Sequence, residues 1–460
     1  MAEPEQVPEA ETEVEYALDR GLVASLYDAL GAHDAARVAE LLEPLHPADV
    51  ADLFEQIGPA KRRDVLSLWR SEDMGEVLSE LDESLREDVI AALEPEALAD
   101  AVRDLDSDDV VDLVEDLDAA QQDAILQVLE APDRVAVEQS LQYPETSAGR
   151  LMQRELVMAP EHWTVGQTID HIRAADDLPD QFYHVILVDP RLRPTGYVTL
   201  GRMLGSTRGT ALSDITEDTF RTIPALQDEA DVAYAFNQYH LISAPVVDEE
   251  DRLVGVITID DAMAVLDEEH NEDILRLAGV GDESVSDTTW AITRQRFPWL
   301  AVNLLTAIVA SLVISIFEEV IMQVVALAVL MPIVASMGGN AGTQSLTVAV
   351  RAIATKDLTG SNAWRVLRRE VTASLLNGLV FAVIMGGVSL VWFGTPVLAL
   401  VIGAAMVINL GVAGFAGLLI PLALDKLGID PALASGTFVT TVTDVVGFFA
   451  FLGLASMILL

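Results

Sequence analysis

Five long apolar segments in the last third of the chain limit its fold more than any other feature. They run over Phe297–Phe317, Val320–Ala352, Val371–Phe393, Pro396–Leu424 and Pro431–Leu459. A hydrocarbon layer about 30 Å thick needs about 20 apolar residues in an α-helix. Helices also satisfy their own backbone hydrogen bonds in lipid. The sequence therefore predicts an α-helical transmembrane bundle of five spans at residues 297–460.

Charge is distributed very unevenly along the chain. Residues 297–460 hold six Lys or Arg and seven Asp or Glu, whereas the whole chain of 460 residues carries a net charge of −46. Such acidity repels nucleic acid and attracts cations, so no nucleic-acid partner is expected. Only three lysines stand beside 73 acids, which is also the composition of a halophilic protein. Total acidity therefore does not identify a metal sensor.

Several classes of enzyme and pump are excluded by composition. There is no cysteine, so no thiolate ligand and no cysteine nucleophile. All seven histidines precede Phe297, so the spans cannot hold a histidine-based metalloprotease site or a Ser–His pair. The chain has no Gly-Lys-Ser/Thr and hence no P-loop. We do not expect an enzyme.

Basic residues predict the orientation of the spans. Arg294 and Arg296 precede the first span, and the loop between spans two and three holds Arg351, Lys356, Arg365, Arg368 and Arg369. Positive residues favour the cytoplasmic side. The acidic start of the chain lacks the features of a signal peptide. We expect a multi-pass protein of the cell (plasma) membrane, with cytoplasmic N-terminal domains and its C-terminus outside.

A helical domain is predicted at residues 15–142, after an acidic tail at residues 1–14 that we expect to be disordered. Its apolar residues recur at i, i+3 and i+4. Three repeated segments, Leu45–Gly58, Leu81–Glu94 and Leu105–Asp118, each place Asp or Ser before an apolar run, as an N-cap would. The repeats predict an all-α, superhelical or solenoid-like N-terminal domain.

Residues 143–266 change to an alternating helix and strand pattern. β-branched runs begin at Val185, Thr195, Ser243 and Leu253. Helical stretches near Val165–Ala175 and Asp228–Tyr239 alternate with them. The block occurs twice, at about Glu155–Leu204 and Leu212–Leu266. It resembles a tandem pair of α/β CBS domains.

Adenine nucleotide binding is implied by that resemblance. CBS pairs often carry a Gly-x-x-Thr/Ser-x-x-Asp pattern whose carboxylate holds the ribose hydroxyls. The second copy has it as Gly255, Thr258 and Asp261, whereas Arg202 takes the place of the acid in the first copy. The resemblance therefore implies ATP or another adenine nucleotide as a cofactor at one site. Alternatively, these residues only end a strand and cap a helix.

Asp444 is the one ionisable residue that lies deep inside a predicted span. A charge at the bilayer centre costs at least about 2.5 kcal/mol on insertion scales, so a functional role is expected. Thr440 lies one helical turn earlier on the same face. With helix carbonyls loosened by Gly436 and Gly447, this carboxylate and these hydroxyls would offer the oxygen ligands that Mg²⁺ or its hydration shell prefers. A structural, hydrogen-bonded acid is the alternative.

Pro332 and the run Gly338–Gly342 predict a break in the helix of the second span. Broken backbone at membrane depth is tolerated where it lines a watery cavity, so Asn340 and Gln344 are expected to line a pore. Close packing of small residues is the alternative. Asn409, among the glycines of the fourth span, is a weaker pattern of the same kind.

Two long motifs make a family resemblance specific. PIVASMGGNAGTQ at 332–344, DPALASGTFVTTVTDVVG at 430–447 and the acidic connecting helix with Glu-Asp-Ile-Leu-Arg-Leu at 272–277 resemble the MgtE family of Mg²⁺ channels. The resemblance covers almost the whole chain. It implies a homodimer with a central pore in which Asp444 binds hydrated Mg²⁺, Thr440 contributes to selectivity and Asp430 lies near the cytoplasmic mouth.

The resemblance also implies a gate that intracellular Mg²⁺ closes by bridging acids of the cytoplasmic domains and of the connecting, plug-like helix and linker at 267–296. The sensor residues implied are Asp228, Asp261, Glu269, Glu272 and Asp273. His240 stands where an acid is expected. Two other functions stay open: a secondary exchanger for Mg²⁺, Mn²⁺ or Co²⁺, and a nonconducting CBS-linked membrane sensor.

Overall fold

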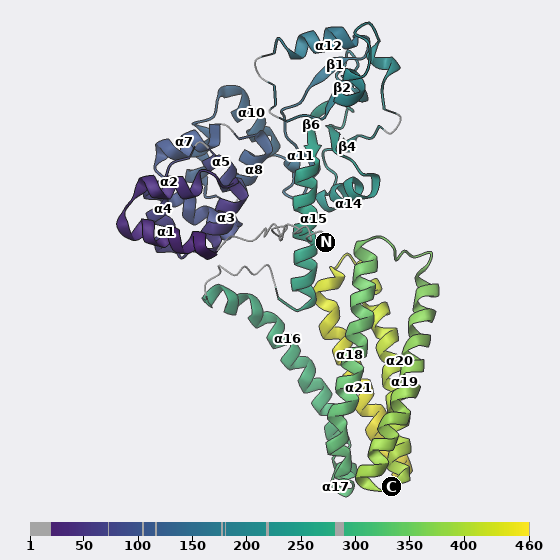
Figure 1. The fold of residues 1–460 in the computed structure, drawn as a ribbon. Helices are drawn as coiled ribbons and strands as arrows, with labels where there is room; N and C mark the ends of the chain where they lie inside the picture. Colours follow the sequence, from purple (N-terminus) through teal and green to yellow (C-terminus); the bar gives the residue numbers. More distant parts are fainter. Residues whose placement is uncertain are drawn as a thin grey trace, which may run out of the picture. The chain divides into compact units, whose positions relative to one another are not determined.

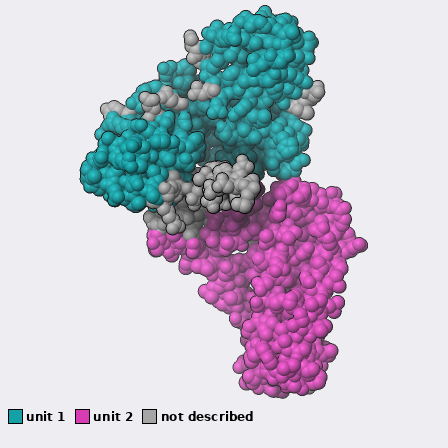
Figure 2. Space-filling model, in the orientation of Figure 1, with its two compact units in different colours: residues 1–266 teal, residues 267–460 magenta. Residues whose placement is uncertain are grey.

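The structure is a computed structural model that describes residues 20–459 except 72, 104, 116, 176–177, 180, 218–219 and 281–288. The chain divides into two compact units, one ending at Leu266 and the other beginning at Asp267 (Figure 2). The predicted disordered tail at 1–14 lies outside the described residues, as does part of the linker between the connecting helix and the first span.

Ten short helices form the N-terminal part of the first unit, as far as the structure describes it. They are α1 (Arg20–Ala32), α2 (Ala35–Leu42), α3 (Pro47–Gln56), α4 (Pro59–Leu68), α5 (Met74–Ser79), α6 (Glu83–Ala92), α7 (Pro95–Arg103), α8 (Ser107–Glu115), α9 (Ala119–Leu126) and α10 (Ala131–Ser140). The predicted all-α domain is confirmed. Asp82 and Asp106 directly precede α6 and α8, and their carbonyls accept the first helical hydrogen bonds, as expected of N-caps.

The N-cap predicted for the first repeated segment is wrong. The N-cap of α3 is His46, whose ring nitrogen accepts a hydrogen bond from the Ala48 amide at 3.3 Å. Pro47 is the first helical residue. Proline is favoured there because its φ is fixed near the helical value and its missing N–H would have no partner anyway.

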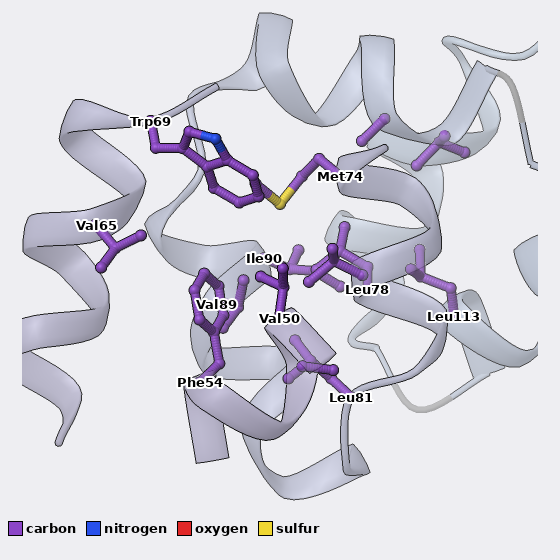
Figure 3. Close-up of a cluster of buried hydrophobic side chains, with 14 of the residues drawn as sticks. Val50, Phe54, Val65, Trp69, Met74, Leu78, Leu81, Val89, Ile90 and Leu113 are labelled. Atoms are coloured by element: carbon purple, nitrogen blue, oxygen red, sulfur yellow. The ribbon is translucent and has the colours of Figure 1, made fainter. Parts of the chain in front are cut away.

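One hydrophobic core joins successive helices of this domain. Figure 3 shows Phe54 of α3, Leu78 of α5 and Val89 of α6 pointing into the same cluster. Each is buried. A single pair of short helices cannot bury its apolar face alone, so stacking of neighbours supplies the core, as in other helical repeats.

Two three-stranded sheets with the same topology follow. The first contains β1 (Met158–Pro160), β2 (His184–Val188) and β3 (Pro194–Thr199), and the second β4 (Ile223–Pro224), β5 (Ser243–Val247) and β6 (Leu253–Thr258). In each sheet the first strand is parallel to the second and the third is antiparallel to it. Their helices are α11 (Ala148–Leu151), α12 (Val165–Ile172), α13 (Leu200–Leu204), the 3-10 turn η1 (Leu212–Asp214) and α14 (Glu229–Tyr239). The predicted duplication is confirmed, although β1 and β4 are too short to show in the sequence.

The second unit contains five helices that are long and apolar enough to cross a membrane, among the residues described. They are α16 (Thr289–Ile316), α18 (Ala326–Ala354), α19 (Ala363–Phe393), α20 (Pro396–Lys426) and α21 (Pro431–Leu459), with α17 (Glu318–Gln323) as a short helix before α18. Helix α15 (Ile259–Leu277) starts in the first unit and ends in the second. The most enclosed span is α20, and α16 is the least (Figure 1).

The predicted break in the second span is wrong. Helix α18 continues through both Pro332 and Gly338–Gly342, because no water in a bilayer core would satisfy the backbone groups that a break exposes. The glycines instead allow close packing: a Cβ on Gly338 would lie 2.2 Å from the Asn409 amide nitrogen, and one on Gly342 would lie 2.6 Å from Val439. Helix α21 is also continuous, so the expected loosening of carbonyls near Asp444 is wrong too.

Candidate functional site

Asp444 lies in the middle of α21 and is half-buried. Among the residues that the structure describes, none donates a hydrogen bond to its carboxylate or forms an ion pair with it. A structural acid inside a span would be expected to have a protein partner, since an unpaired charge there is costly. The geometry therefore favours a carboxylate that takes its partner from outside the chain.

The hydroxyls of Thr440 and Thr443, close to Asp444 in the sequence, donate their hydrogens to carbonyl oxygens of their own helix. Thr440 donates to the carbonyls of Gly436 at 3.0 Å and Thr437 at 3.1 Å, and Thr443 donates to the carbonyl of Thr440 at 2.9 Å. A hydroxyl keeps two lone pairs when its hydrogen is used. The oxygen of Thr440, a partly exposed residue, can thus accept from the water shell of a cation without breaking the helix, whereas Thr443 is fully buried.

Helix α18 carries a polar stripe on the surface of the single chain. Its exposed members are Ser336, Asn340, Thr343, Gln344 and Thr347. This helix packs directly on α21, where Gly342 meets Val439 and Thr443. The predicted pore residues Asn340 and Gln344 therefore lie on the helix that contacts the Asp444 helix, and they face away from the chain's own core.

Asp430, at the start of α21, meets the end of the connecting helix α15. One carboxylate oxygen accepts from the Ala432 amide at 2.7 Å, and the other accepts from Arg276 at 3.1 Å. Arg276 also pairs with Glu272 at 2.6 Å. Burial raises the pKa of the neighbouring Asp273 carboxyl, with a contribution from the charge of Asp430. The structure thus joins two predicted sensor acids to the predicted pore-mouth acid.

A second group of acids lies where α8 of the helical domain approaches the start of α15. Burial raises the pKa of Asp109 to about 7, and the charges of Asp261 and Asp106 add to this. Burial and the charge of Asp261 also raise the pKa of Asp108. Sequence reasoning missed Asp106, Asp108 and Asp109, because about 150 residues separate them from Asp261.

Asp261 is held at the first turn of α15. Its carboxylate accepts from the Thr258 hydroxyl at 2.7 Å and from the Thr258 amide at 3.3 Å. Burial raises its pKa to about 6, against the lowering effect of the Thr258 hydrogen bonds. Within the described part of the chain, no three Asp, Glu or His side chains are already arranged as a metal site.

Two other predicted positions lie outside this group of acids. Asp228 is the exposed N-cap residue of α14 and makes no side-chain cap. His240 ends the same helix in the left-handed region with φ 53°, and it is exposed. The structure places them at opposite ends of one helix.

The predicted nucleotide residues do not form an open site here. A Cβ on Gly255 would lie 2.7 Å from the Gln153 carbonyl oxygen, which explains the glycine by packing. Thr258 borders a cleft between the two CBS copies that also contacts Tyr183, His184 and Ser243, but its volume is only about 20 Å³. Such a cleft holds about one water molecule. Nucleotide binding would require it to widen.

Glu370 and Ser345 form a polar pair that sequence reasoning missed. The Ser345 hydroxyl of α18 donates to the Glu370 carboxylate of α19 at 2.7 Å. The third span was expected to begin at Val371, whereas α19 begins at Ala363. The sequence signal for this earlier start was the helical apolar pattern, which continues before Val371 to Leu367, a residue that is buried in the structure.

Comparison with known proteins identifies the family. The family model described as "divalent cation transporter" matches residues 331–454, the MgtE intracellular N domain matches 45–146, and the CBS domain matches 212–268. A protein named magnesium transporter MgtE from Enterococcus faecalis is 35% identical over 68% of this chain and 69% of its own length. Its namesake from Thermus thermophilus is 34% identical over 68% of this chain and 70% of its own length. The chain belongs to the MgtE family.

The MgtE matches cover the residues that geometry selects. Asn340 and Asp444 lie in the transporter region, Asp108 and Asp109 in the MgtE N domain, and Asp261 in the matched CBS copy. Among solved structures, the cytosolic domain of the Mg²⁺ channel MgtE in complex with ATP has a TM-score of 0.49, with 30% identity, and covers 53% of this chain and 99% of that one. The soluble part of a magnesium transporter has a TM-score of 0.48 with 24% identity, covering 54% of this chain and 98% of that one.

Proposed function

We propose that this MgtE-family protein is a Mg²⁺-selective channel or transporter of the cell membrane that intracellular Mg²⁺ closes. The observation that carries the proposal is the carboxylate of Asp444 in the middle of a membrane span, which has no hydrogen-bond or ion-pair partner among the residues described. Its relatives are named magnesium transporters. Mg²⁺ keeps several waters and takes oxygen ligands, which suits one carboxylate with Thr440, Asn340 and, at the mouth, Asp430.

We place the pore between two copies of the chain. The polar stripe of α18 is exposed on the single chain, and polar side chains inside a bilayer face a bundle interior or a watery cavity. A homodimer that brings two such stripes together would line a central path and remove them from lipid. The exposed basic residues at the α18–α19 loop support a cytoplasmic position for that end.

Gating follows from repulsion among the cytoplasmic acids. Burial raises the pKa of Asp108 and of Asp109, and the charge of Asp261 adds to both shifts, so the compact arrangement is unfavourable when all three acids are ionised. A divalent ion relieves that repulsion only where the acids converge, and its differential affinity therefore favours the compact, closed state. The acids beside Asp430 on α15 would couple this change to the pore mouth.

Mg²⁺ flux into liposomes that contain the purified full chain tests the proposal. We expect Asp444→Asn to abolish uptake while the exposed acid variant Asp425→Asn retains it, with both proteins remaining dimers by mass. Uptake at the wild-type rate in Asp444→Asn would refute the assignment. An exchanger, unlike a channel, would lose its flux when the gradients of candidate coupled ions are dissipated.

A further inference from the structure

Asn409 is a buried amide at the centre of the membrane bundle. It belongs to α20 and has no exposed surface. Its amide nitrogen donates to the Val334 carbonyl oxygen of α18 at 2.8 Å. Its oxygen has no hydrogen-bond partner among the described residues. A polar side chain with one unsatisfied atom is expensive in such an interior, so a purely apolar residue would pack there at lower cost.

Two glycines, one on α18 and one on α21, leave the space that this amide occupies. A Cβ on Gly338 of α18 would lie 2.2 Å from the amide nitrogen, and a Cβ on Gly447 of α21 would lie 2.7 Å from it. Neither position therefore accepts a side chain while Asn409 keeps its place. The adjacent Gly339 differs, since a Cβ there would meet nothing within 4 Å.

These contacts connect the two helices that carry the proposed pore residues. Gly338 lies two residues before Asn340, and Gly447 lies three residues after Asp444, which is nearly one helical turn. Helix α20 is the most enclosed span, so it is a fixed reference for both neighbours. A shift of α21 along its axis by one turn would bring the Asn409 amide against Thr443 or Phe451, neither of which is glycine.

We infer that Asn409 is a positioning residue that sets the axial register between the Asn340 turn of α18 and the Asp444 turn of α21. The directional hydrogen bond to Val334 fixes the amide, and the two glycines fix each helix against it. The inference rests on the proposed function for its consequence, which is the placement of Asp444 for ion passage. The register itself is a property of the fold and has a readout without transport.

The test compares Gly447→Ala, Asn409→Ala and the double variant Asn409→Ala/Gly447→Ala, with Gly339→Ala as matched control. The concentration of Mg²⁺ for half-maximal flux is measured per folded dimer. Misplacement of a reacting or binding group by about 1 Å can lower a rate by about a hundredfold. We therefore expect Gly447→Ala to raise the Mg²⁺ concentration for half-maximal flux by about tenfold or more. The control should stay within about twofold. In the double variant this concentration should return toward the value of Asn409→Ala, because the Asn409 amide that meets the Cβ at position 447 is absent.

A second readout uses the absence of native cysteine. Thr440→Cys is introduced in each background, and the rate of labelling by a water-soluble thiol reagent is measured. We expect the rate to change by about tenfold with Gly447→Ala and not with Gly339→Ala. Unchanged labelling and unchanged half-saturation in Gly447→Ala would overturn the inference, as would a lower yield of folded protein with normal half-saturation. Wild-type flux in Asp444→Asn would instead count against the proposed function, with the labelling result still deciding the register.

Discussion

Substitution of Asp109 by Asn should stabilise the contact between α8 and the start of α15 at neutral and alkaline pH. Asp109 has a pKa of about 7 in the folded chain, against 3.8 ordinarily, chiefly through burial and then through the charge of Asp261. At 1.36 kcal/mol per pKa unit, this difference corresponds to about 4 kcal/mol. We expect Asp109→Asn to gain about half of this free energy, because partial exposure to solvent screens the charge of Asp109.

The sign of the pH dependence follows from proton binding. Between about pH 4 and pH 7 the folded chain binds more protons at Asp109 than the unfolded chain does. Stability therefore falls as pH rises through that window and is constant above it. In Asp109→Asn this part of the decline is absent. Addition of Mg²⁺ above pH 7 should raise the stability of this contact in the wild-type protein, and it should raise it less in Asp109→Asn.

Hydrogen exchange of the α8 amides in the full chain measures this effect locally. Rates are corrected for intrinsic exchange and compared at pH 5 and pH 8, with and without Mg²⁺. Asp123→Asn, an exposed acid on α9, is the matched control and should behave as wild type. If Asp109→Asn kept the wild-type pH dependence, repulsion at this contact would be the wrong explanation.

Two further outcomes are expected. Neutralising Glu269, Glu272 and Asp273 together by amide substitution should raise open probability at millimolar internal Mg²⁺, because the acids that we propose to bind the closing ion on α15 are lost. Electrophysiology in liposomes with Mg²⁺ varied on each side measures this, and unchanged gating would count against these acids as sensors. Gly75→Ala should destabilise the helical domain by about 1–3 kcal/mol, since a Cβ there would lie 2.2 Å from the Ala101 carbonyl oxygen, whereas Gly58→Ala meets nothing within 4 Å. Thermal unfolding compares the two, and equal melting temperatures would contradict the packing argument.

Local patterns predict most of the fold because each depends on neighbouring residues. Alternation and β-branching gave the four longer strands, β2, β3, β5 and β6, and sustained apolarity gave the five spans. Contacts between distant residues left no such signal. Asp109 approaches Asp261, and Arg276 pairs with Asp430 across 154 positions. Each contact contains one acid that the sequence singled out, Asp261 or Asp430, but the sequence did not show its partner.

The glycines of α18 show why composition alone wrongly predicted a break in this helix. Glycine permits both a broken helix and a close helix contact, and the sequence does not distinguish these uses. The neighbouring helices decide between these uses: Gly338 and Gly342 face α20 and α21 and so allow close contact, while the side chain of Asn340 between them is exposed. An outward polar stripe is costly against lipid. In the pore that we propose between two copies, dimerisation and formation of the ion path would be one event, and a variant that prevents the dimer should lose Mg²⁺ flux even with Asp444 intact.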